Sequence, residues 1–511
     1  MPPDSKRSQR RERFHILVAF LGNCPTLMIL ASRPYFQELL QNQIWQGANF
    51  ISKALFLALL TPWMLRNWGP EGYGLFALAS SLFVSLALLD GGIRSLTRVR
   101  LASSSSHGLG APPGEVIANG LVAFSMICGL VGILAVGAAW HGGLSLVLRL
   151  PPGGAWVLCL SGFLTAFWMA TVLALEPLAA AGQLSRVKSA NTCGMMLALP
   201  ACSLVLWLQG GPLPAILALM ISLLVPNLWL LRQTSGWGSG VVGWIHPTLR
   251  SLRETLREGF PYYLTTLALI AKTHGLTFVV SALAGPAEAG VFYILLRLSE
   301  TLSTVGATAT ETSVAALSSL PPNQRRGTFQ QAWRWTTLFC LHGAIVLTFL
   351  GHDFWKVWVP EFANLSPWVW PALASLGLAG GWSQMVVNAS MGMNQVRSAS
   401  RVALGESVLA LVLAPLGFYL AGFPGLFAGG SAGVLVTWIQ ARRLAQLDHA
   451  SFGELWIRPL RSLFPGWVLC AVLLGVVSFF HLLWLEALVL LVPAFLIFRH
   501  IQNFSRRGSP S

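Results

Sequence analysis

Three cationic side chains lie inside long apolar stretches of the sequence. Lys53, Lys272 and Arg297 each stand in a stretch that holds few other charges. A charge inside a bilayer is costly, so it usually faces a cavity or a partner. Lysine offers a point charge and arginine a two-pronged donor, a combination that suits a phosphate or pyrophosphate group. We therefore expect these three side chains to line a central hydrated cavity and to attract an anionic substrate.

Each of these residues also has a purely structural interpretation. Arg297 and Glu300 are three residues apart, which allows an ion pair on one helix face that merely holds helices together. Lys53 could extend its stem toward the membrane interface, although it lies near the middle of its apolar stretch. His274 stands beside Lys272, and for it a hydrogen-bonded interior histidine is favoured over a proton relay.

Polar residues continue the helical faces that carry the cations. Asn49 precedes Lys53 by four residues and Thr304 follows Glu300 by four, which is the spacing of one helix face. The residues that we expect along the polar side of the cavity are Asn49, Thr304 and Asn388. The candidates for ion coupling are the acids Glu176, Glu300 and Glu406.

The sequence carries no signature of soluble enzyme chemistry. It has no G-x-x-x-x-G-K-[ST], H-E-x-x-H or G-x-S-x-G motif. Its 7 cysteines stand singly in apolar stretches, so they indicate small buried hydrophobic residues and no metal site. We predict no catalytic residue, no metal and no cofactor, and we do not expect an enzyme.

The elements that must position these residues are membrane helices. A bilayer core needs about 20 mostly apolar residues per helix, and fourteen such stretches can be found. They are residues 43–65, 73–91, 116–140, 155–177, 190–208, 212–231, 259–283, 289–312, 335–351, 366–390, 402–420, 424–441, 463–481 and 482–499. The predicted fold class is all-α, a polytopic membrane protein of about 14 transmembrane helices.

Composition and charge agree with this prediction. Hydrophobic residues make up 54% of the chain and charged residues 10%, whereas a soluble protein carries about 25% charged residues. With both termini in the cytoplasm, 27 of the 33 lysines and arginines fall in cytoplasmic segments. That asymmetry is the positive-inside pattern of a multi-pass protein. It explains the net charge of +15 without a nucleic-acid partner.

An internal repeat divides the predicted helices. Gly69-Pro70 and Gly74 match Gly285-Pro286 and Gly290 at an offset of 216 residues, and a second turn matches at an offset of 211. The repeat predicts two parallel six-helix lobes around an axis along the membrane normal. The expected regions are a cytoplasmic or interfacial N-terminal extension (residues 1–41), an N-lobe (42–240), a C-lobe (241–442), and a C-terminal helix pair with a basic tail (443–511).

The matched turns also carry a family resemblance. The segment from Leu65 through Gly69-Pro70-Glu-Gly-Tyr73-Gly74 resembles the L-G-P-x-x-Y-G turn of bacterial polysaccharide flippases. Asp90-Gly-Gly with the distal Arg98 is similar to their D-x-G motif. Over about residues 42–440 the chain resembles the polysaccharide/O-antigen (Wzx-like) family of the multidrug/oligosaccharidyl-lipid/polysaccharide exporter superfamily.

The resemblance implies a function and a location. Members move polyprenyl-pyrophosphate-linked oligosaccharides across the bacterial inner membrane by alternating access. The expected partners are therefore a lipid-linked glycan, membrane lipids and glycan-assembly proteins, with the pyrophosphate held by Lys53, Lys272 and Arg297. Two alternatives stay open: a multidrug cation antiporter of the same superfamily, and a membrane glycan polymerase or ligase. The cations favour the flippase over the antiporter, and the short predicted outer loops disfavour the enzyme.

Overall fold

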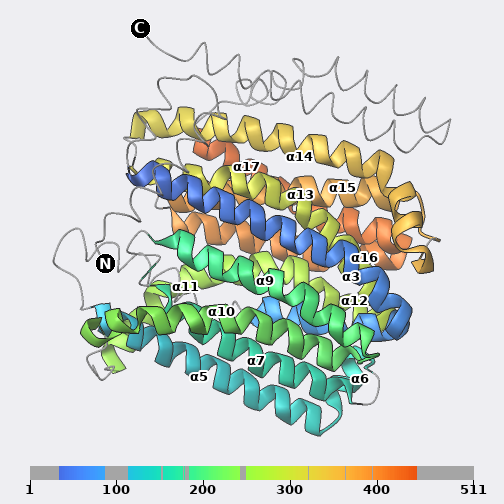
Figure 1. The fold of residues 1–511 in the computed structure, drawn as a ribbon. Helices are drawn as coiled ribbons and strands as arrows, with labels where there is room; N and C mark the ends of the chain where they lie inside the picture. Colours follow the sequence, from blue (N-terminus) through green and yellow to red (C-terminus); the bar gives the residue numbers. More distant parts are fainter. Residues whose placement is uncertain are drawn as a thin grey trace, which may run out of the picture.

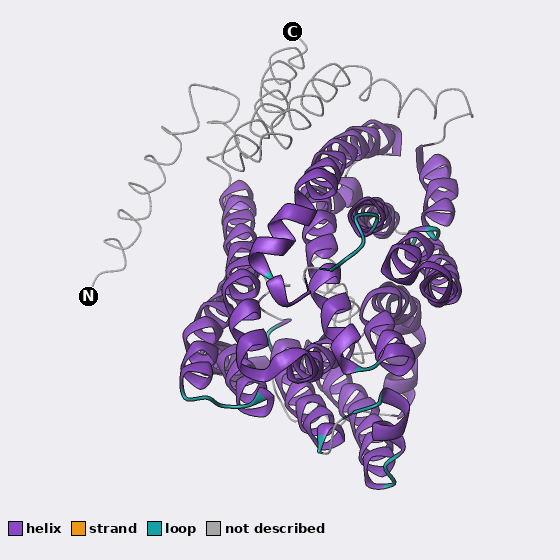
Figure 2. Ribbon diagram, turned by 90° about the vertical axis from the view of Figure 1, so that its right-hand side faces the viewer, coloured by secondary structure: helices purple, strands orange, loops and turns teal. Residues whose placement is uncertain are grey.

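The structure is a computed structural model of the 511-residue chain. It describes residues 34–86, 113–150, 153–176, 178, 183–241, 249–319, 322–362, 364–393 and 395–445. The predicted N-terminal extension up to residue 33 and the predicted spans at 463–481 and 482–499 lie outside the described residues. Throughout the described part the chain is helical and contains no strand, as Figure 2 shows.

The described helices follow the predicted apolar stretches. In chain order they are α3 (Pro34–Leu86), α5 (Pro113–Trp140), α6 (Gly143–Leu148), α7 (Gly154–Ala174), α9 (Leu184–Trp207), α10 (Pro212–Val241), α11 (Leu249–Ile270), the π-helix η1 (Ala271–Gly275), α12 (Leu276–Ala284), α13 (Pro286–Ser319), α14 (Pro322–Trp358), the 3₁₀-helix η2 (Pro360–Phe362), α15 (Val369–Gly392), α16 (Val396–Ser431) and α17 (Val434–Ala445). Five of these α-helices begin at a proline, the residue whose fixed φ and missing N–H suit the first helical position. The all-α membrane fold predicted from the sequence is confirmed.

Helix boundaries differ from the predictions at three places. Helix α3 begins at Pro34, before the predicted start of the first span, and continues through a kink at Gly69 into the second. A second kink, at Ala421 and Gly422, joins two predicted spans within α16. The predicted span 424–441 is interrupted before α17, where Gly433 packs so closely on α16 that an added Cβ would lie 2.8 Å from the Glu406 carbonyl oxygen. The breaks at Gly69, Gly422 and Gly433 occur at glycines. The hydrophobic periodicity of the sequence does not reveal where such breaks fall.

The helices form two groups that pack against each other (Figure 1). In the N-terminal helix group, α3, α7, α9 and α10 pack together and α5 packs on α7. In the C-terminal helix group, α15 packs on α13, α14, α16 and α17, and α11 packs on α16. The main contact between the groups is that of α3 with α13. One apolar cluster runs through both groups and includes Leu78, Phe292 and Phe427.

The α3–α13 contact uses the glycines that the repeat matches. Gly69 has φ 69° and ψ −179°, and its counterpart Gly285 has φ 105° and ψ 174°, a region that glycine enters without steric cost. After each turn comes the second matched glycine, Gly74 or Gly290. A Cβ at Gly74 would collide with the backbone of Pro286, and one at Gly290 would lie 3.2 Å from the Gly74 Cα. The two repeats therefore meet where neither has a side chain.

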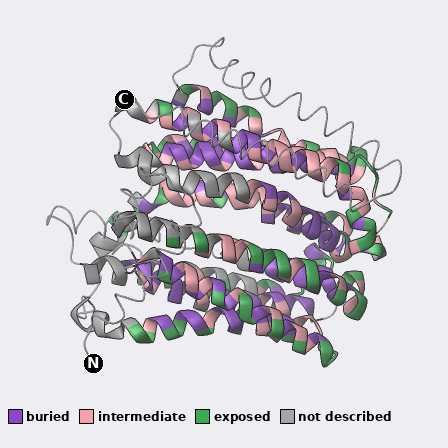
Figure 3. Ribbon diagram, turned by 45° about the horizontal axis from the view of Figure 1, so that its top comes forward, coloured by how far each residue is buried: buried purple, intermediate pink, exposed green. Residues whose placement is uncertain are grey.

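The outer surface of the described helices is suited to lipid. In the part of the chain that the structure describes, seven helical stretches are long and apolar enough to cross a membrane. Exposed positions recur along the described helices (Figure 3). Many of them carry large apolar side chains, among them Ile133, Phe163 and Leu420. A surface of this kind is solvated by hydrocarbon, and backbone polar groups are satisfied within each helix. The chain is a multi-pass membrane protein.

Candidate functional site

The polar interior of the C-terminal helix group contains two linked clusters. We call them the Glu300 cluster (Ser81, His274, Tyr293, Arg297 and Glu300) and the Glu406 cluster (Lys272, Ser383 and Glu406). They draw residues from α3, η1, α13, α15 and α16. Lys272 and His274 lie two residues apart on η1, so this short segment contributes to both clusters. A π-helical turn inside a longer helix is frequent at functional sites.

Glu300 is the centre of the first cluster. Its Oε2 lies 2.6 Å from Nη1 of Arg297, one helical turn away on α13. Its Oε1 lies 3.2 Å from Nε2 of His274. The carboxylate therefore has a partner on each oxygen. The Arg297–Glu300 pair expected from the sequence is present, but it belongs to a network of several helices rather than to one helix face.

The remaining contacts of this cluster hold Arg297 and His274 in place. Arg297 Nη2 donates to the Tyr293 hydroxyl at 2.8 Å, and its guanidinium lies 4.7 Å from the centre of that ring. Guanidinium groups favour such a position over an aromatic face. The other nitrogen of His274 lies 3.4 Å from Ser81 Oγ on α3. Because Ser81 belongs to the N-terminal helix group, the buried His274 joins the two groups.

The Glu406 cluster is a compact buried triad. Lys272 Nζ lies 2.6 Å from Glu406 Oε2 and donates to Ser383 Oγ at 3.2 Å. Ser383 Oγ in turn donates to Glu406 Oε2 at 2.5 Å. The side chain of Lys272 is 12% exposed and that of Glu406 1%. Lys272 is thus paired with Glu406, and its expected contact with a substrate stays a prediction.

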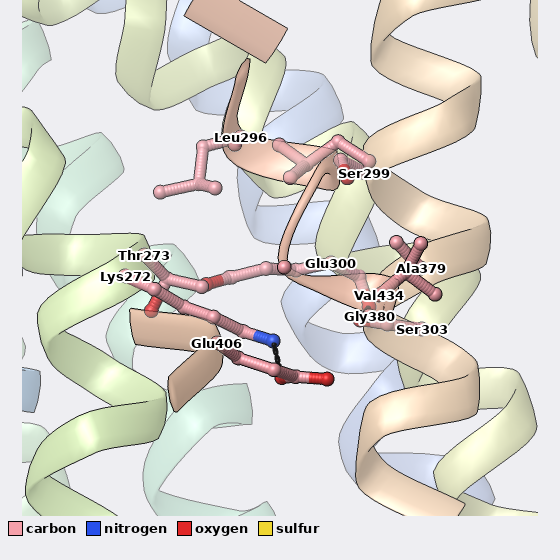
Figure 4. Close-up of a pocket in the computed structure, with 13 residues that line it drawn as sticks. Lys272, Thr273, Leu296, Ser299, Glu300, Ser303, Ala379, Gly380, Glu406 and Val434 are labelled. Carbon is pink, nitrogen blue, oxygen red and sulfur yellow. Dashed lines mark hydrogen bonds and ion pairs between the residues drawn. The ribbon is translucent and has the colours of Figure 1, made fainter. Parts of the chain in front are cut away.

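A small cavity adjoins this triad (Figure 4). Its volume is about 30 Å³, enough for one or two water molecules. Its polar lining consists of Lys272, Thr273, Ser299, Glu300, Ser303 and Glu406. The second oxygen of Glu406, Oε1, is buried and has no hydrogen-bond partner in the described part of the chain. Glu300 is the residue that the cavity shares with the first cluster.

Lys53 lies between the two helix groups, apart from the Glu406 cluster. Its ammonium has Coulombic interactions with Arg297 and Glu300 on α13 and with Lys188 on α9. Its side chain is exposed and makes no hydrogen bond or ion pair with any described residue. We call Lys53, Lys188 and Arg297 the cationic cluster. It carries three positive charges beside the one negative charge of Glu300.

The structure separates some residues that the sequence suggested would act together. Lys53 and Arg297 share one electrostatic environment, whereas Lys272 belongs to the neighbouring triad. Glu176 is buried just beyond α7 and does not line the cavity. Asn49 is partly buried on α3, and its Oδ1 has no described hydrogen-bond partner. The two other predicted polar residues, Thr304 and Asn388, are also partly buried and do not line the cavity.

Four residues of these clusters were not singled out from the sequence: Ser81, Tyr293, Ser383 and Lys188. Ser383 and Tyr293 are ordinary residues of apolar helices, and nothing in their local pattern marks them. Lys188 is one of the 27 lysines and arginines of the predicted cytoplasmic segments. The sequence did contain one indication that Lys188 is more than a topological cation. This residue stands within the second turn that the internal repeat matches. Among the described residues no group of three or more His, Cys, Asp or Glu is arranged to hold a metal ion.

Comparisons with solved structures define the class of fold. The chain is similar to the lipid II flippase MurJ in an inward closed conformation, with a TM-score of 0.65 and 14% identity over 90% of this chain and 99% of that one. It is similar to a multidrug resistance MATE transporter of the MOP superfamily in an inward-facing conformation, with a TM-score of 0.60 and 15% identity over 78% of this chain and 95% of that one.

A third similar structure is the MATE multidrug transporter DinF-BH, determined in complex with a ligand. Its TM-score is 0.60, with 15% identity over 82% of this chain and 98% of that one. No protein-family model and no curated protein matches the sequence. The chain therefore has the fold that MATE transporters share with the lipid II flippase MurJ.

Proposed function

We propose that this protein is a flippase that moves a polyprenyl-pyrophosphate-linked oligosaccharide across the bacterial inner membrane. The observation that carries the proposal is Lys53, a cation within a membrane helix that makes no ion pair or hydrogen bond with the described residues. An isolated charge at such a position is costly. A negatively charged ligand would offset that cost, and it would do so next to Arg297 and Lys188.

The chemistry of the cationic cluster suits a diphosphate. Lys53 and Lys188 supply compact point charges from the N-terminal helix group, and Arg297 supplies planar paired donors from the C-terminal group. A diphosphate between them would contact both groups at once. Lys272 stays with Glu406 in this proposal, so the anion is held by three cations of which the sequence suggested two.

The helix arrangement supports alternating access around this ligand. The two groups touch through backbone at Gly74 and Pro286 and through the His274–Ser81 contact. Rocking of one helix group against the other about this crossing would open the site to each side of the membrane in turn. The polyprenyl chain would remain in lipid between the groups while the charged head passes inside.

A multidrug cation antiporter is the second candidate. The observation in its favour is the Glu406 carboxylate, which lines a cavity and has a free oxygen among the described residues, together with the similarity to the multidrug transporter DinF-BH. The local charge opposes it, because a cationic drug that approached Glu300 would meet Lys53, Lys188 and Arg297. The two candidates thus differ in the sign of the ligand charge.

Reconstitution in liposomes tests the proposal. The substrate is a fluorescent polyprenyl diphosphate disaccharide, and dithionite quenching reports the fraction that crosses the bilayer. We expect Lys53→Gln to lower the flipping rate at least tenfold, because the ligand loses a cation within the membrane. The matched control is Lys356→Gln, which removes an exposed lysine in the last turn of α14.

Two outcomes would overturn the proposal. One is unchanged flipping by Lys53→Gln in vesicles where the Lys356 variant behaves as the wild type. The other is wild-type protein that accumulates the cationic dye ethidium under an ion gradient and leaves the polyprenyl diphosphate in its original leaflet. The second outcome would establish the antiporter instead.

A further inference from the structure

We propose that Lys272 is a tethered counter-ion: its ammonium occupies a monovalent-cation site formed by Glu406 and Ser383, so the protein needs no sodium ion or added proton to neutralise Glu406. This inference goes beyond the proposed function, since it concerns which ion the C-terminal helix group uses. It applies whether the ligand is a lipid diphosphate or a drug.

The geometry of the Glu406 cluster resembles the binding of a small cation. The ammonium lies between a carboxylate oxygen at 2.6 Å and a hydroxyl oxygen at 3.2 Å, and hard cations prefer oxygen ligands of these types. The site is enclosed, because Glu406 is 1% exposed and Lys272 12%. A buried carboxylate must be paired or protonated. Here a side chain of the same protein provides the pairing.

The carboxylate retains capacity for one more ligand. Glu406 Oε1 is buried without a partner among the described residues, and the adjoining cavity has room for water. If the ammonium were removed, a hydrated monovalent cation or a proton would therefore find a site already lined with oxygen atoms. Thr273, Ser299 and Ser303 also line this space.

Glu406 differs from the other carboxylate at the cavity. Among the described residues the charged side chains that line the cavity are Lys272, Glu300 and Glu406. Glu300 already has Arg297 and His274 as partners. The residues of α15 and α17 that line the cavity are uncharged, and Ser383 is neutral. Lys272 is thus the cation in direct contact with Glu406 among the described residues, and its loss leaves Glu406 without a counter-ion from that part of the chain.

Thermal unfolding of the purified full-length protein tests the inference without any substrate. Wild type and Lys272→Ala are compared at pH 7.5 in sodium chloride, methylammonium chloride and choline chloride of equal ionic strength. We expect the melting temperature of the wild type to be the same in all three salts. The Lys272→Ala variant should melt several degrees lower in choline and regain stability in sodium or methylammonium, because those ions fit the vacated site and choline does not.

Two further variants separate the cation site from a general loss of stability. Lys272→Ala combined with Glu406→Gln removes both charges, so it should show no difference between the salts. Glu288→Gln, at an exposed acid of α13, should behave as the wild type.

Two results would overturn the inference. The first is a wild-type protein that melts at a higher temperature in sodium than in choline, if Glu406→Gln abolishes that difference. Sodium would then bind where we place the ammonium. The second is a Lys272→Ala variant that melts at the same temperature in all three salts. If Lys272→Ala cannot be purified in any salt whereas the double variant can, the site does not accept a free cation and the inference fails as well.

Discussion

The crossing of α3 and α13 allows one substitution to be worked out in detail. At Gly74 an added Cβ would collide with backbone atoms of Pro286, and no side-chain rotation can relieve a collision with backbone. In an open helical position, alanine is about 1 kcal/mol more favourable than glycine. Overpacking a tight contact costs about 1–3 kcal/mol, and we expect the upper end because the two helices must separate. The net effect of Gly74→Ala is a loss of about 2 kcal/mol.

Two other glycines provide a graded control for this prediction. Gly290 faces the same crossing, where a Cβ would lie 3.1 Å from Tyr73 Cδ1, so Gly290→Ala should be nearly neutral. Gly132 on α5 has no atom within 4 Å of the added Cβ, so Gly132→Ala should be stabilising. The order of melting temperatures in detergent is therefore expected to be Gly132→Ala, wild type, Gly290→Ala and Gly74→Ala, from high to low.

The same series reports on transport. Because the crossing is the main contact between the helix groups, Gly74→Ala should also slow flipping in liposomes while leaving the binding of a polyprenyl diphosphate intact. If Gly74→Ala melts as high as Gly132→Ala, the two helices do not meet at their glycines and the reasoning is wrong.

Two further predictions concern contacts of single side chains. Arg297→Lys keeps the charge beside Glu300 but loses the planar donors that also reach Tyr293. We expect the protein to stay folded and its flipping rate to fall about tenfold, equivalent to about 1.4 kcal/mol. An unchanged rate in the liposome assay would contradict this prediction. Trp358 donates its indole N–H to the Ala58 carbonyl at 2.8 Å, a bond between the two helix groups. Trp358→Phe should therefore cost about 0.5–1.5 kcal/mol in thermal unfolding, and a stability equal to that of the wild type would show that the bond is not maintained.

The sequence by itself determined that this is a multi-pass helical protein and where most of its helices lie. The physical reason is that hydrocarbon forces each spanning segment to be long, apolar and internally hydrogen-bonded. Prolines at helix starts and the glycine-proline turns are equally local signals. The match of Gly69 with Gly285 predicted two turns that prove to share one backbone conformation.

The sequence also placed the polar residues on their helices without showing which of them meet. Periodicity indicates the face of a helix on which Lys53 or Arg297 lies, because that depends only on the 3.6-residue repeat. The pair of Arg297 with Glu300 was visible for the same reason. The predicted roles of these residues in binding a substrate remain predictions.

Only the tertiary structure decided the partners across helices. Lys272 and Glu406 are 134 residues apart in the chain, and Ser383 reaches both from a third helix. Two helices that are polar on one face can pack in many rotations and registers, and the choice depends on close backbone approaches such as those at Gly74 and Gly433. That choice pairs Lys272 with Glu406 inside the C-terminal helix group, whereas Lys53 makes no hydrogen bond or ion pair with the described residues.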